Sequence, residues 1–83
     1  MRDTRLMSRT LLAMRDNGGV AMQRDCGLDR YAWFAGDAQL NAQAMHDLIS
    51  DGWVRLLHQY GLALIDTWPL FADHLLNEET AHG

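Results

Sequence analysis

The chain has 83 residues, which is short for two domains and leaves room for only a modest core. Hydrophobic residues make up 48% of it and are spread between turn-forming segments, which excludes a disordered polar chain and predicts a single domain over residues 1–83. The net charge is −4, but residues 1–30 hold six arginines and four aspartates, a net of +2, whereas residues 31–83 hold one arginine and seven acidic residues, a net of −6.

The first predicted element is a helix over residues 4–16. Met7, Leu11 and Met14 recur on one of its faces at helical spacing. The segment Asn17-Gly18-Gly19 ends this helix, because its residues tolerate the left-handed conformation that commonly follows a helix. The same turn leads the chain directly into an extended segment.

A first hairpin is predicted next. Residues 20–24 have the alternation of a strand, with Val20 and Met22 on one side. A second extended run, Tyr31-Ala32-Trp33-Phe34, follows the turn-forming residues 25–29. Two short extended runs joined by a turn are most economically read as an antiparallel pair.

A second helix is predicted over residues 42–51, with Asn41 as its N-cap and Gly52 after its end. Its buried stripe is expected to contain Met45, Leu48 and Ile49. The polar residues of its solvent-facing side are Gln43, His46, Asp47, Ser50 and Asp51.

The last part of the chain predicts a second hairpin and a third helix. Residues 53–58 and 62–66 form the hairpin, and the helix follows Thr67 and Pro69 and ends near Asn77. The globular part is therefore expected over 4–76, with a solvated tail over 77–83. The predicted common core consists of Met7, Leu11, Leu48, Ile49, Val54 and Leu64.

The resulting α+β order, α-β-β-α-β-β-α with two β-hairpins, resembles a winged-helix domain. The resemblance rests on residues 11–20, on Leu48-Ile49-Ser50-Asp51-Gly52-Trp53-Val54 and on the wing-like residues 60–67. It implies that helix 42–51 enters the DNA major groove, with the hairpin 53–66 along the backbone. The chain departs from the family pattern between its first two helices, where a hairpin replaces the usual second helix.

The distribution of charge along the chain bears on nucleic-acid binding. Helix 42–51 has hydrogen-bonding side chains but no lysine or arginine, and Asp47 and Asp51 repel phosphates. Arg2, Arg5 and Arg9 form the alternative contact, a strip for the nucleic-acid backbone. The plainer interpretation of these arginines is a solvated helix face with local ion pairs.

The sequence offers no pattern for catalysis or for cofactor or metal binding. His46, His58, His74 and His82 lack the i,i+4 spacing of metal ligands on a helix. Cys26 has no base near it in sequence, and its neighbouring arginines are offset by aspartates. Because Cys26 is the single cysteine, a disulfide within the chain is excluded and a reducing, cytoplasmic location is expected. No apolar run predicts secretion or membrane insertion.

The sequence therefore favours a small non-enzymatic regulator or inhibitor that binds another protein, whose basic site normally holds nucleic acid. This profile resembles small phage-encoded antagonists of bacterial defence or host machinery. The alternative is a winged-helix DNA-binding transcriptional regulator, and the modest core leaves homodimerisation open. The expected partner-binding residues are Gln43, His46, Asp47, Ser50, Asp51 and, as an aromatic anchor, Trp33.

Overall fold

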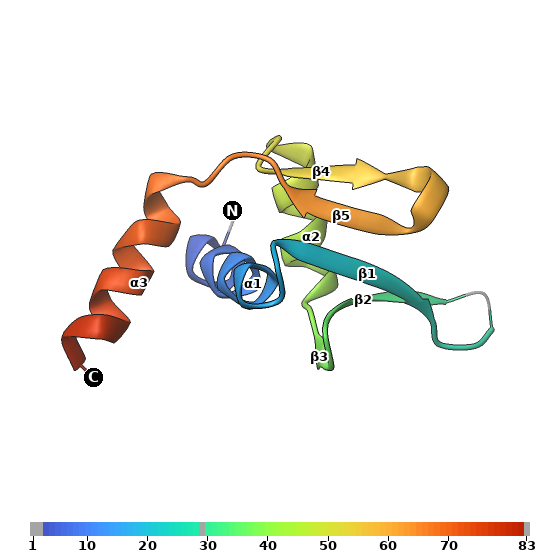
Figure 1. Cartoon of the computed structure of the whole chain (residues 1–83), viewed down its shortest axis with the longest axis horizontal. Coiled ribbons are helices and arrows are strands. Elements are labelled where there is room, and N and C mark those ends of the chain that lie inside the picture. The colour runs from blue at the N-terminus through green and yellow to red at the C-terminus, as the bar shows by residue number, and fades with distance from the viewer. Residues whose placement is uncertain (1–2, 29, 83) are drawn as a thin grey trace.

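A computed structural model describes residues 3–28 and 30–82, with side chains up to residue 78. Three helices, one short 3-10 helix and five strands follow one another along the chain (Figure 1). Their order agrees with the predicted α-β-β-α-β-β-α arrangement, apart from one additional short strand. The elements are α1 (Thr4–Asp16), β1 (Val20–Asp25), β2 (Tyr31–Ala35), β3 (Ala38–Gln39), α2 (Ala42–Ser50), β4 (Val54–Leu57), η1 (His58–Tyr60), β5 (Leu62–Ile65) and α3 (Leu70–His82).

Both ends of α1 are fixed by local hydrogen bonds. The Asp3 carboxylate accepts a bond of 3.0 Å from the Leu6 N–H, which satisfies one of the unpaired donors of the first turn. At the other end the Gly19 N–H donates to the Met14 carbonyl at 2.7 Å, so the glycine turn predicted from the sequence closes the helix. The predicted bounds of this helix are confirmed.

The five strands form one antiparallel sheet in the order β3-β2-β1-β5-β4. The predicted hairpins are β1–β2 and β4–β5, and β1 joins them by pairing with β5. β3 is the additional strand. It has only two residues, Ala38 and Gln39, and is too short to leave a periodic pattern in the sequence.

The core lies between one side of this sheet and the helices α1 and α2. Met7, Leu11, Leu48 and Val54 are fully buried in it, as predicted, and Ile49 packs at its margin. Leu64 was predicted to belong to this core, and that prediction is wrong. Its neighbour Ala63 points inward and is completely buried, so Leu64 points to the opposite side of the sheet, because successive strand residues alternate.

Helix α3 packs against α1 and extends the core away from the sheet (Figure 1). Ala72 and Leu75 are its buried contacts, and the Phe71 ring meets the Trp53 ring edge-to-face at 6.0 Å between centroids. The helix continues to His82, whereas the sequence predicted an end near Asn77. Residues 78–81 include no glycine or proline, so their polar composition does not mark the end of the helix.

The two hairpins project from the helices side by side and elongate the molecule to 42 × 25 × 24 Å (Figure 1). The likeness to a winged helix is limited to α2 and the β4–β5 hairpin that follows it. The β1–β2 hairpin stands where the standard motif has another helix, as the sequence predicted. Among residues 3–28 and 30–82, no helix combines the length and the apolar composition needed to cross a membrane.

Candidate functional site

The exposed side of α2 brings together the polar residues predicted to bind a partner. Asn41 caps this helix by accepting a 2.9 Å bond from the Ala44 N–H. Gly52, with φ +84°, turns the chain from α2 into β4. Gln43, His46, Ser50 and Asp51 are exposed and Asp47 is half-buried. The Gln43 amide donates to the Asp47 carboxylate at 3.1 Å, so this pair is ordered along the helix.

The tryptophans are less exposed to a partner than the sequence suggested. Trp33 lies on β2 opposite Gln23 and is half-buried against the core. Trp68 is also half-buried, because its indole N–H donates to Asp73 at 2.6 Å and the Arg15 guanidinium lies 5.4 Å from its ring centroid. The widely exposed aromatic residues of the described chain are Tyr31 and Tyr60, one near each hairpin tip.

The arginines predicted as alternative nucleic-acid contacts lie at the start of the chain. Arg2 falls outside the described residues. Arg5 and Arg9 are both exposed on α1, and Arg5 makes an exposed ion pair of 3.9 Å with Glu78 of α3. This acidic neighbour weakens the attraction that Arg5 exerts on a phosphate.

A second surface was not predicted as a site. It is the outer face of the sheet, which we define as the side opposite α1 and α2. Strand alternation and pairing place six apolar side chains larger than alanine there, all of them partly exposed and none in the core cluster. They are Val20, Met22, Phe34, Leu57, Leu62 and Leu64.

Four of these side chains form one row across four strands. Phe34 pairs with Met22, Met22 with Leu62, and Leu62 with Leu57. Because neighbouring strands are about 4.8 Å apart, this cross-strand row is about 14 Å long. Met22, at its centre, is 47% exposed, a large value for an apolar residue in an inner strand.

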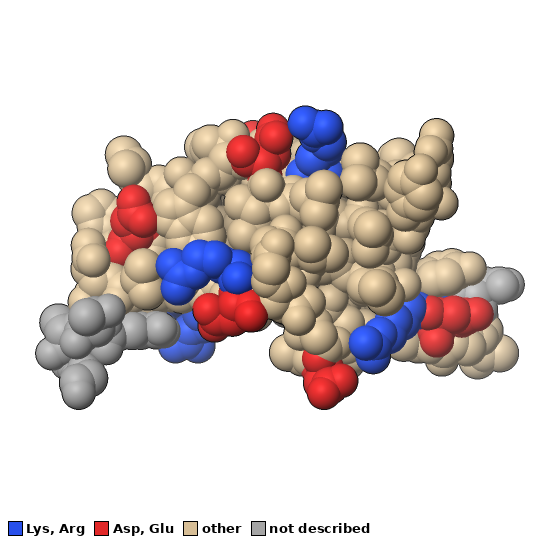
Figure 2. All heavy atoms as spheres, in the orientation of Figure 1, with Lys and Arg blue, Asp and Glu red and all other residues tan. Residues whose placement is uncertain are grey.

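An arginine lies near each end of the cross-strand row. The Arg24 side chain reaches from β1 over the Phe34 ring toward Gly36, and Arg55 precedes Leu57 by two residues on β4. The two guanidinium groups therefore lie near the Phe34 end and the Leu57 end of the row. In Figure 2 the surface over the hairpins is a broad uncharged area with a blue group above it and another below it.

Local contacts hold both guanidinium groups near the sheet. Arg24 lies 4.8 Å from the centroid of the Phe34 ring and donates to the Gly36 carbonyl at 3.1 Å. Arg55 forms an exposed ion pair of 3.5 Å with Asp66. Both arginines therefore remain accessible at the edge of an apolar surface.

A hollow of about 320 Å³ opens at the Leu57 end of the row. Residues 56–60 line it, and they include the exposed Tyr60 of η1. The hollow extends the row from β4 into the turn of the second hairpin. An apolar row that ends in a hollow offers a partner both a contact surface and a place for one anchoring side chain.

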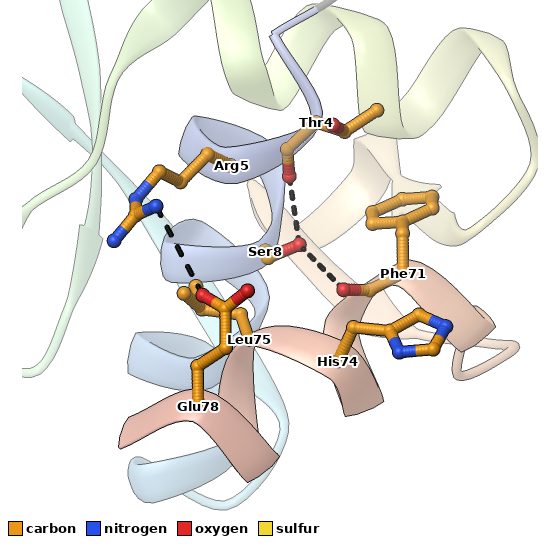
Figure 3. Close-up of a pocket in the computed structure, with 7 residues that line it drawn as sticks. All are labelled: Thr4, Arg5, Ser8, Phe71, His74, Leu75 and Glu78. Carbon is orange, nitrogen blue, oxygen red and sulfur yellow. Dashed lines mark hydrogen bonds and ion pairs between the residues drawn. The ribbon is translucent and has the colours of Figure 1, made fainter. Parts of the chain in front are cut away.

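Another concave region, of about 200 Å³, lies between α1 and α3 (Figure 3). Ser8 is buried there, and its hydroxyl donates to the Thr4 carbonyl at 2.7 Å and lies 3.3 Å from the Phe71 carbonyl. The His74 imidazole points away from Ser8 in Figure 3, so it is not placed to accept the proton of this hydroxyl. The contact between Ser8 and Phe71 joins α1 to α3 and gives the region a structural role.

The described residues contain no group of three histidine, cysteine, aspartate or glutamate side chains arranged to hold a metal ion. Cys26 is exposed, and its sulfur lies 3.8 Å from the Arg24 carbonyl. Comparison with known proteins gives no match to a family model, to a curated protein or to a solved structure. A function for this chain is therefore assigned from the chemistry of its own surfaces.

Proposed function

We propose that the chain is a small non-enzymatic regulator or inhibitor that acts by binding another protein. The observation that carries the proposal is the outer face of the sheet, where six apolar side chains lie outside the core. Contiguous exposed apolar surface is typical of protein–protein contact sites, because its burial on association releases water.

The polar side of α2 supports a second contact within the same function. Asp47 and Asp51 lie one turn apart on a helix with no lysine or arginine, which suits a basic partner surface such as one that normally holds nucleic acid. The alternative, a winged-helix DNA-binding regulator, requires this helix to approach phosphates. Two carboxylates and no cation on α2 disfavour that approach.

Affinity purification from the native host tests the proposal. The tagged chain is compared with a Met22→Glu, Leu62→Glu variant, in extracts with and without nuclease treatment. Recovery of one protein partner that survives nuclease and is lost with the variant supports protein binding. Recovery of nucleic acid in place of a protein contradicts it and favours the DNA-binding alternative.

A matched control keeps this test specific to the outer face. Leu70 is a large apolar residue on α3 with 77% exposure, and it lies outside both hairpins. Leu70→Glu introduces a single carboxylate at an apolar site that is more exposed than Met22. It is expected to retain the partner, whereas the outer-face variant loses it while its circular dichroism spectrum stays unchanged.

A further inference from the structure

We propose that the outer face of the sheet receives an amphipathic helix of the partner protein, with carboxylates beside both ends of its apolar stripe. This inference rests on the proposed function, because it specifies the partner of the same surface. It is carried by the juxtaposition of the cross-strand row Phe34–Met22–Leu62–Leu57 with Arg24 and Arg55.

The dimensions of the row fit a short helix. A helix rises 1.5 Å per residue, so a row of about 14 Å is matched by about ten residues, or nearly three turns. Over that length a helix presents apolar residues at i, i+3 or i+4, i+7 and i+10 or i+11 on one side. The hollow beside Leu57 accommodates the last of these side chains.

The arginines determine the charge of the partner helix. The Arg24 guanidinium lies over Phe34 and Arg55 lies beside Leu57, so a helix lying along the row has one arginine near each of its ends. Carboxylates beside both ends of the apolar stripe pair with them. Asp66 lies beside Arg55 on the same face, and their exposed ion pair leaves room for a second carboxylate at that guanidinium.

A second copy of this chain fits the surface less well. Face-to-face packing of two identical sheets brings two copies each of Arg24 and Arg55 into one interface, where partial desolvation makes like charges costly. The polar side of α2 from another copy has the right charge, but Gln43, His46 and Ser50 offer no apolar stripe to cover the row. Charge and apolarity together therefore favour a different protein.

Two designed peptides of about 14 residues are the probes. Both place leucines along one helical side, and they differ only in having glutamates or lysines beside both ends of this leucine stripe. Fluorescence anisotropy with the intact chain is expected to show roughly tenfold tighter binding of the glutamate peptide at low salt, with a smaller difference at high salt. Amide chemical-shift changes should centre on Met22 and Leu62.

Matched variants identify the charges responsible. Arg24→Glu combined with Arg55→Glu should reverse the preference toward the lysine peptide, whereas Arg5→Glu combined with Arg9→Glu on α1 should leave it unchanged. Equal binding of the two peptides, shift changes centred on α2, or a dimer of the free chain that Leu62→Glu disrupts would each overturn the proposal. Loss of a native partner through Met22→Glu, Leu62→Glu while the peptides fail would reject this helical partner and leave the protein-binding function standing.

Discussion

Met22 of β1 lies directly opposite Leu62 of β5 on the outer face of the sheet. One residue earlier on β1 and one later on β5, Ala21 and Ala63 pair on the side that faces the helices, and both are completely buried. At these positions the two strands direct small side chains to the core and larger ones outward. This arrangement lets α1 pack closely on the sheet and leaves apolar surface on its other side.

The assignment of the two sheet faces is tested by paired truncations. Leu48→Ala removes a fully buried side chain of α2 and is expected to lower the free energy of unfolding by about 2–5 kcal/mol. Leu64→Ala removes the same atoms from the outer face and should cost less than about 1 kcal/mol, because its environment is already partly solvated. Denaturant titration measures both. Equal losses would show that Leu64 belongs to the core.

The requirement for small residues beneath the helices gives a second stability prediction. Ala63→Leu adds three carbons to a completely buried position and should destabilise the fold by about 1–3 kcal/mol through overpacking. Ala32→Leu is the matched control, because Ala32 lies on the outer face opposite Arg24. Thermal unfolding should show little change for the control, and a well-tolerated leucine at position 63 would contradict the close approach of the helices.

Helical periodicity predicted α1 and α2 almost to the residue, since Met7, Leu11 and Leu48 are large, apolar and regularly spaced. The buried faces of the strands were harder to predict, because β1 and β5 carry apolar residues on both sides. Leu64 was assigned to the core as part of the apolar phase of its strand, whereas Ala63 is the inward residue. A strand reveals its buried face clearly when its other face is polar, and these strands lack that contrast.

The candidate site was predicted in part for the same reason. Polar residues on α2 are visible in the sequence because a single helix places them together. The cross-strand row joins residues from four strands, and its pairing is set by strand order and register. The sequence does contain one indication of the outer face. The larger apolar residues Met22, Leu62 and Leu64 alternate with Ala21 and Ala63.

Duplex DNA is expected to bind weakly and without sequence preference. The chain carries a net charge of −4, and the cation-free helix α2 presents carboxylates where a winged helix presents its DNA-reading side. Fluorescence anisotropy at moderate salt, with duplexes of unrelated sequence, measures this affinity. Submicromolar binding that depends on sequence and is lost in Arg5→Glu, Arg9→Glu would support the DNA-binding alternative.

Charge reversal on α2 tests the proposed contact with a basic partner. Asp47→Arg combined with Asp51→Arg should slow association with the native partner, with a smaller effect at high salt, because rim charges act mainly on the encounter. Circular dichroism should remain unchanged, since Asp51 is exposed and Asp47 is only half-buried. Undiminished association of this variant, with clear loss in Arg5→Glu, Arg9→Glu, would move the contact to α1.

Site-specific photo-crosslinking in the native host tests the central claim most directly. A photoreactive amino acid replaces Met22 at the centre of the outer face, and in a matched chain it replaces Leu70 on α3, which is also exposed. The account predicts a crosslink from position 22 to one protein of defined mass, unaffected by nuclease and absent from position 70. Crosslinks from position 22 to nucleic acid alone, or equal protein crosslinks from both positions, would contradict the claim that this sheet face is a specific protein-binding surface.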